Sequence, residues 1–207
     1  MIEELKDIEN HVLADLLKNP SIWNTLDVNY HKPRVERLWT QVGESRLMLH
    51  VIHPCAPGES LYHPHPWPSA MHVLKGRYEM GLGIRHTPGI KEIQEMMGGR
   101  SPLIDCGKDE HDIKVFIKQI CKIEMNGDNH YEMLENKGWH FVRPVDEICY
   151  SLMLIGKPFE EKDDQDIPKK WGKLPELEED RKLDILRIFR EIIRLSNVGE
   201  KIWRVGG

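Results

Sequence analysis

The chain has 207 residues, of which 40% are hydrophobic and 30% charged, as is typical of a globular protein with one well-buried core. The formal net charge of -5 gives no electrostatic reason to expect a nucleic-acid partner. The acidic opening from Met1 to Asp7 lacks the basic start of a signal peptide, and no stretch approaches the roughly 20 apolar residues that span a bilayer, so we expect a cytoplasmic protein with no membrane partner.

Residues 1–34 are predicted to form a helical segment that packs on the rest of the protein. Apolar residues from Ile2 to Leu16 recur at helical spacing until Asn19-Pro20 breaks the pattern. This pattern predicts one amphipathic helix.

Strands dominate residues 35–160. An apolar run from Leu47 to Ile52, alternating residues from Tyr78 to Ile84 and from Ile113 to Met125, and a run from Ile148 to Ile155 are separated by glycine turns. The simplest closure of these strands is a β-barrel or sandwich. The interval from His86 to Asp112 is predicted to be a long loop, either a lid over the barrel mouth or a passive surface insertion.

Residues 161–207 are predicted to form a polar surface connection followed by a helix. The apolar stripe from Leu183 to Leu195 has helical spacing, and Glu178 to Asp180 supply negative charge at its start. We expect this helix to cover a face or edge of the barrel, with an oligomer contact as the alternative.

Three histidines form the most informative pattern in the chain. His63 and His65 flank Pro64, and in an extended chain residues at i and i+2 point to the same side. His140 follows a glycine turn on a later strand and is the candidate third ligand. The alternative is that His63 and His65 lie in a rigid, proline-flanked surface turn.

The chemistry of three imidazoles predicts a divalent metal and an acidic substrate. Neutral imidazole suits iron, zinc, copper and nickel, so the residues alone do not name the metal. Because the ligands carry no charge, the ion keeps its full positive charge and favours an anionic small molecule such as a carboxylate or thiolate.

The motifs resemble the cupin superfamily. Its first motif of glycine, H-x-H and a strand ending in glycine is matched by Gly58, His63, His65 and Gly76, and its second is matched loosely from Gly127 to His140. The family's glutamate position falls on Ser69. The resemblance implies a mainly β fold, the cupin double-stranded β-helix or jelly-roll barrel, with the N-terminal helix and C-terminal helical segment added to it.

Within the cupins the pattern is similar to the cysteine dioxygenase-like thiol dioxygenases, which hold non-haem iron with three histidines. On the last barrel strand that family alternates serine, histidine and tyrosine, where this chain has Ser151, Met153 and Ile155. The resemblance implies that the substrate carboxylate is held by an arginine before the first motif. That position falls on Arg37, with Arg34 as the fallback.

Two further residues are candidate catalytic groups, namely Arg143, three residues after His140, and Tyr78, on the strand after Gly76. His72 is expected to point away from the metal, with a packing or supporting role. His130 and His111 are expected to lie in loops.

The preferred function is a metal-dependent cupin enzyme, a dioxygenase that acts on a small acidic substrate. Fe(II) is favoured as the cofactor, and zinc, nickel or manganese are the alternatives. The competing hypotheses are a redox-neutral metal-dependent isomerase or lyase and a non-catalytic small-molecule-binding cupin. By analogy with cupins, a homodimer is plausible.

Overall fold

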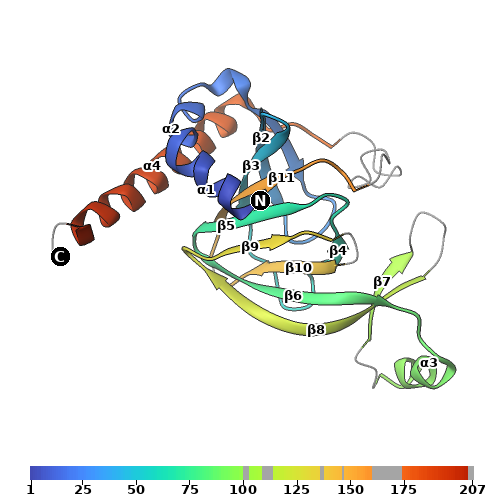
Figure 1. Ribbon diagram of the computed structural model, residues 1–207. Helices are drawn as coiled ribbons and strands as arrows, with labels where there is room; N and C mark the ends of the chain where they lie inside the picture. The colour runs from blue at the N-terminus through green and yellow to red at the C-terminus, as the bar shows by residue number, and fades with distance from the viewer. Residues whose placement is uncertain (100–102, 109–113, 136–137, 146, 160–173, 205–207) are drawn as a thin grey trace.

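Two antiparallel sheets form the body of the protein (Figure 1). The computed structural model describes residues 1–99, 103–108, 114–135, 138–145, 147–159 and 174–204. The first sheet has six strands, in the order β1 (Asn24–Val28), β2 (Val35–Val42), β3 (Ser45–Ile52), β11 (Cys149–Ile155), β5 (Ser69–Lys75) and β9 (His130–Met133). The second has five strands, in the order β4 (His63–Pro64), β10 (Gly138–Pro144), β6 (Arg77–His86), β8 (Lys114–Asn126) and β7 (Leu103–Lys108).

The chain winds back and forth between these sheets. From β3 to β6 and again from β8 to β11, each strand lies in the sheet opposite to that of its predecessor. This winding closes the sheets into a jelly roll. The predicted mainly β fold, a jelly roll with helices added to it, is thereby confirmed.

Strand alternation separates an inner face from an outer face. On β11, Met153 and Ile155 belong to an apolar cluster between the sheets, whereas Leu152 and Leu154 belong to the cluster beneath the helices. Both faces of this strand are buried, which explains its nearly continuous apolar sequence.

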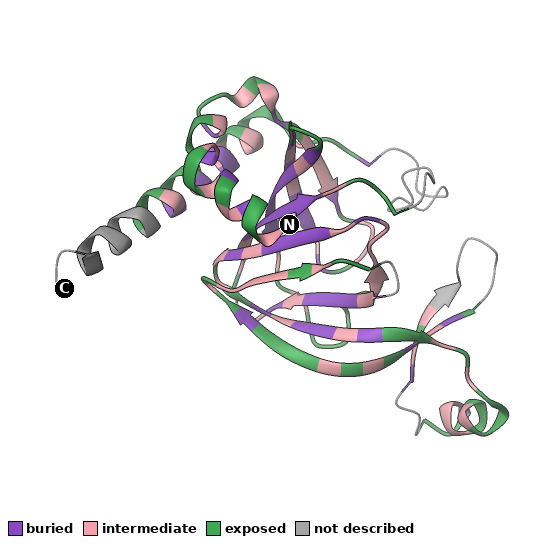
Figure 2. Ribbon diagram, viewed as in Figure 1, coloured by how far each residue is buried: buried purple, intermediate pink, exposed green. Residues whose placement is uncertain are grey.

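Helices cover the outer face of the six-stranded sheet (Figure 1). They are α1 (Ile2–His11), α2 (Leu13–Leu16), the short 3-10 helix η1 (Pro20–Ile22) and α4 (Glu179–Arg204). Ile185, Leu186 and Phe189 of α4 are fully buried, and burial of each such side chain contributes about 1.5–3 kcal/mol. In Figure 2 the buried residues accordingly concentrate along the strands of this sheet.

The N-terminal segment differs from its prediction. The expected single helix is divided at Val12 into α1 and α2, and the segment 1–34 also supplies an edge strand, β1, which pairs with β2. The expectation of an entirely helical segment is therefore wrong. Residues 24–28 carry only a weak local preference, and their pairing with β2 makes them a strand.

The interval after His86 also differs from its prediction as a loop. It contains the helix α3 (Ile90–Met97) and the strand β7, which pairs with β8. Residues 100–102 and 109–113, which include His111, lie outside the described part of the chain, as does most of the polar connection predicted after residue 160. None of the described helices is both long enough and apolar enough to cross a membrane.

Candidate metal centre

The pairing of β4 with β10 brings the first and third of the predicted histidines together. His63 lies directly opposite His140 in the antiparallel register, and Pro64 lies opposite Trp139. Directly opposed residues share one face of a sheet, so both imidazoles project to the same side. His65, two residues after His63, projects to that side as well.

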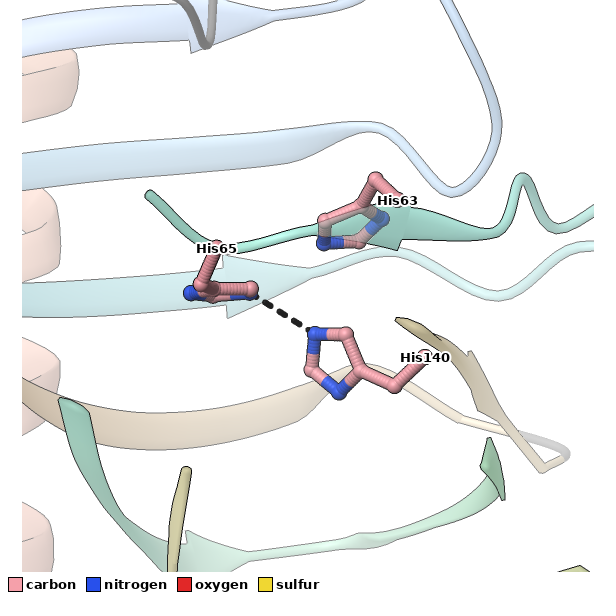
Figure 3. Close-up of side chains that lie close together, drawn as sticks. All are labelled: His63, His65 and His140. Carbon is pink, nitrogen blue, oxygen red and sulfur yellow. Dashed lines mark hydrogen bonds between the residues drawn. The ribbon is translucent and has the colours of Figure 1, made fainter. Parts of the chain in front are cut away.

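The three imidazoles converge on one point (Figure 3). One ring nitrogen from each of His63, His65 and His140 lies within 4.8 Å of the others. The ring centroids are separated by 5.3 Å for His63 and His65, 4.8 Å for His63 and His140, and 4.7 Å for His65 and His140.

Hydrogen bonding determines which nitrogens face the centre. Nδ1 of His63 lies 3.2 Å from the carbonyl oxygen of Leu61, to which it can only donate, so in the neutral ring Nε2 keeps its lone pair for the centre. Nε2 of His65 and Nε2 of His140 lie 2.8 Å apart. Two neutral rings can share one proton there, or both can offer lone pairs to a cation, and the donor set therefore fits a metal ion.

The electrostatic surroundings keep the imidazoles neutral. Burial of the ring lowers the pKa of His63 to about 4. Burial, together with the other histidines, lowers the pKa of His65 and of His140 well below the usual histidine value. Because a metal binds the neutral imidazole, protons compete little for these nitrogens near neutral pH.

A polar row on the opposite sheet faces the same centre. Arg37 on β2 lies opposite His50 on β3, and His50 lies opposite Ser151 on β11. His50 lies two residues from Met48 and Ser151 two residues from Met153, and both methionines belong to the inner cluster, so alternation places this row on the inner face. The positive charge of Arg37 accordingly adds to burial in lowering the pKa of both His63 and His65.

Two atoms of this row have unused hydrogen-bonding capacity. Nε2 of His50 and Oγ of Ser151 are buried and have no hydrogen-bond partner among the described residues. A buried polar atom without a partner costs about 1–3 kcal/mol, so such atoms are typical of a ligand site.

Two residues near the centre escaped the sequence analysis. His50 lies within the apolar run of β3, where both faces are buried and no alternation reveals its direction. His31 lies between β1 and β2, with its ring stacked at 6.1 Å from that of His63. Neither histidine belongs to a recognisable sequence motif. Both come near the centre only when the segment from β1 to β3 folds against the other sheet.

Two of the predicted catalytic residues lie elsewhere. Tyr78 is fully buried and donates a 2.9 Å hydrogen bond to the Tyr131 hydroxyl. Leu82 is the residue of β6 that lies opposite His140, and Tyr78 lies four residues before it on the same strand. At the rise of a strand, this places Tyr78 roughly 13 Å along β6 from the position opposite the ligand. Arg143 lies opposite Glu79, with Nε 3.7 Å from its carboxylate, and alternation along β10 directs it away from His140.

Arg34, the fallback for the substrate arginine, and Trp139, which precedes His140, both make contacts away from the centre. Arg34 makes hydrogen bonds of 2.8 and 3.0 Å to the carboxylate of Asp27. Trp139 packs in an outer cluster with Phe141. Trp67 does lie beside the centre, with its ring edge-on to His65 at 6.3 Å, and it helps to enclose the site.

Comparison with known proteins finds solved structures that are similar to this chain at low sequence identity. No protein-family model matches the sequence, and no curated protein sequence matches it. Hydroxypropylphosphonic acid epoxidase from S. wedmorenis is similar over 66% of this chain and 56% of its own, with 8% identity and a TM-score of 0.43. AerE from Microcystis aeruginosa is similar over 65% of this chain and 46% of its own, with 18% identity and a TM-score of 0.39. KdgF from Halomonas sp. is similar over 65% of this chain and 88% of its own, with 9% identity and a TM-score of 0.38. The chain thus spans about half the length of the first two proteins, and the assignment of the centre rests on its own geometry.

Proposed function

We propose that this protein is a metal-dependent enzyme that holds one divalent ion through His63, His65 and His140. The observation that carries the proposal is the convergence of three imidazoles from two strands inside a jelly roll. Three neutral ligands leave an octahedral ion with open positions for other molecules. Fe(II) is the favoured ion, and zinc, nickel and manganese are the alternatives.

The substrate class follows from charge. The ion would retain its full positive charge, and Arg37 adds a second positive charge on the facing sheet. A guanidinium binds a carboxylate through two parallel hydrogen bonds. We therefore propose a small acidic substrate, with a thiol or amino-acid group as the second point of attachment to the ion.

His50 and Ser151 would orient that substrate. Their unpartnered atoms lie in the same row as Arg37, so a molecule held by the guanidinium passes within reach of both. In the thiol dioxygenases that the sequence resembles, the serine is followed two residues later by a histidine on the same strand, whereas here the imidazole comes from β3.

The reaction we favour is oxidation of the bound substrate by dioxygen. An iron(II) ion, when bound, supplies the redox chemistry that dioxygen requires. The chain positions the substrate through Arg37, keeps the ligand imidazoles neutral by burying them, and restricts water with Trp67 and the apolar inner cluster.

Metal analysis combined with oxygen uptake tests this function. The protein would be purified without a histidine tag, stripped, and reloaded separately with iron(II), zinc and manganese. Oxygen consumption that depends on iron and on a member of a thiol and amino-acid panel is the expected result. Turnover with zinc or manganese and no oxygen consumption would establish the redox-neutral alternative, and a folded protein that retains no metal would overturn both.

A further inference from the structure

A second cluster of metal-binding side chains lies on the outer face of the six-stranded sheet. It consists of Glu9 on α1, His72 on β5 and His130 on the edge strand β9, and one donor atom from each lies within 4.8 Å of the others. His72 and Ala70 share the side of β5 that faces the helices, opposite to the inner face. The sheet therefore separates this cluster from His63, His65 and His140.

The sheet register and the helix together assemble the cluster. His72 lies directly opposite His130, and their rings stack at 3.8 Å with an angle of 17° between them. The carboxylate of Glu9 spans both rings, because its Oε1 accepts a 2.7 Å hydrogen bond from Nδ1 of His72 and its Oε2 lies 3.5 Å from Nε2 of His130. Two ligands bonded at about 2.1 Å to one tetrahedral zinc ion lie about 3.4 Å apart, which matches the separation of Glu9 and His130. Zinc would replace the shorter hydrogen bond of His72, and the two rings would turn out of their stack so that both lone pairs point at the ion.

The tautomer of His130 leaves two electron-rich atoms facing each other. Nδ1 of His130 lies 3.3 Å from the carbonyl oxygen of Asp128 and can only donate to it. In the neutral ring Nε2 then carries a lone pair, and this buried atom has no hydrogen-bond partner although Oε2 of Glu9 lies 3.5 Å away. A cation between the two atoms satisfies both, and a backbone carbonyl on the far nitrogen is the usual support of a histidine ligand.

The cluster is shielded enough for such an ion to matter. The side chains of His72, Glu9 and His130 are 13%, 14% and 21% exposed. The start of α1 is attached to the same edge strand, since the backbone N–H of Ile2 donates a 3.1 Å hydrogen bond to Glu132. Glu9 is thus held over the two rings by a contact that does not involve the cluster.

We propose that Glu9, His72 and His130 bind a second divalent transition-metal ion, with zinc as the best-matched species. Two imidazoles and one carboxylate are a ligand set that zinc and iron(II) use in proteins. The ion fastens α1 to the edge of the sheet, which makes this a stabilising site. The proposal is independent of the function assigned to the inner centre.

Zinc titration in a variant that lacks the inner centre provides the test. Tag-free protein carrying His65→Ala and His140→Ala would be stripped and titrated with zinc against a chromophoric chelator. We expect one equivalent of zinc per chain. We also expect the melting temperature to rise by about 5–10 °C at a zinc concentration about a hundredfold above the dissociation constant. Absence of zinc binding by the folded variant would overturn the proposal.

Two additional variants locate the ion. Glu9→Gln in the same background keeps the side-chain size, removes the charge, and is expected to weaken zinc binding by at least about tenfold. Glu132→Gln alters the other contact between α1 and β9 and should leave the equivalent of zinc in place. An unchanged affinity in Glu9→Gln contradicts the proposal. Should Glu9→Gln fail to fold, cobalt(II) added to the parent variant decides the matter, because tetrahedral ligation gives strong visible absorption bands and their absence contradicts the assignment.

Discussion

His140 is the residue on which the inner centre depends most. It is 3% exposed, it lies opposite His63, and its Nε2 faces Nε2 of His65 at 2.8 Å. Each of the other two ligands belongs to a short segment around β4, whereas His140 is held within a seven-residue strand paired on both sides. The paired strand β10 therefore holds His140 in a fixed place, and the segment with His63 and His65 packs beside it.

Replacing His140 by alanine should remove one equivalent of metal per chain. Since loss of even a supporting partner of a ligand lowers metal affinity by about 10–100-fold, we expect loss of a ligand to lower it by more than about a hundredfold. Metal content after dialysis measures the effect. His11→Ala is the control, because His11 is exposed on α1, and retention of full occupancy in His140→Ala would refute the ligand assignment.

Arg37 should determine affinity for acidic ligands. Arg37→Gln removes charge-assisted hydrogen bonds worth about 1.5–3 kcal/mol, which corresponds to a rise in the dissociation constant of about 10–100-fold. Calorimetric titration of the metal-loaded protein with oxalate, a chelating dicarboxylate, measures this change. Arg143→Gln is the matched control on the outer side of β10, and an equal loss of affinity in both variants would argue against a specific role for Arg37.

The strand β6 holds β10 in place through close packing on its outer side. Gly81 lies opposite Phe141, and a Cβ at this position would overlap the Phe141 ring and come within 2.6 Å of the Tyr62 hydroxyl. Phe141 follows His140 directly, so any shift of its ring is transmitted to the neighbouring ligand. The absence of a side chain at Gly81 is thus a packing requirement of the centre.

Gly81→Ala should accordingly destabilise the protein and loosen the metal. Overpacking of this kind costs about 1–3 kcal/mol, which urea denaturation can resolve. Gly127→Ala is the control, because its added Cβ would lie 3.7 Å from the nearest atom, the carbonyl oxygen of Leu74. If the two variants were equally stable, the close packing of β6 on Phe141 would not be a constraint.

A buried ion pair joins the C-terminal helix to the sheet. Glu36 is 3% exposed, and both of its carboxylate oxygens accept hydrogen bonds from Arg181 on α4, at 2.8 and 2.6 Å. Burial alone would raise the pKa of Glu36, but hydrogen bonds and charge from Arg181 and His53 outweigh it and lower the pKa from 4.5 to about 2. The pair therefore couples the folding of distant parts of the chain to pH.

The stability of the whole protein should fall in acid through Glu36. Between pH 4.5 and about 2 the unfolded chain binds the proton that the folded chain excludes, so the contribution is complete above pH 4.5 and is lost as the pH falls through 2. This difference corresponds to a free energy of unfolding on the order of 3 kcal/mol. Urea denaturation of Glu36→Gln at several pH values should show a shallower acid slope, and an unchanged slope would contradict the account.

Arg181→Met tests the same pair from the helix. Removing both Arg181 hydrogen bonds leaves the buried carboxylate with its 2.8 Å contact to His53 and the longer one to Arg34. This removal should cost about 3 kcal/mol at pH 7, and the loss should shrink as Glu36 becomes protonated. Arg187→Met is the matched control on the same helix, because Arg187 is solvent-exposed and pairs with Asp184, a residue of α4 itself. Equal losses of stability in both variants would mean that the buried pair contributes no more than a surface pair.

Local patterns predicted those features whose physical cause is local. The i, i+2 spacing of His63 and His65 sufficed to place both rings on one side, and the stripe from Leu183 to Leu195 sufficed to predict α4. Tyr78 was misplaced because alternation shows that a residue faces inward but not how far along the strand the site lies. Arg143 was misplaced because nearness in sequence to His140 does not override alternation along β10.

The sequence by itself determined the alternation of the strands, the amphipathic helices and the H-x-H spacing of His63 and His65, since each depends on neighbours within a few residues. Only the tertiary structure decided which residues face one another across strands. It brought His50 and Arg37 to the inner centre and gathered Glu9, His72 and His130 outside it. The physical reason is that strand register and helix docking are selected by burial over the whole chain, and a shift of one residue in the register of a strand would turn that strand's side chains to the other face of the sheet.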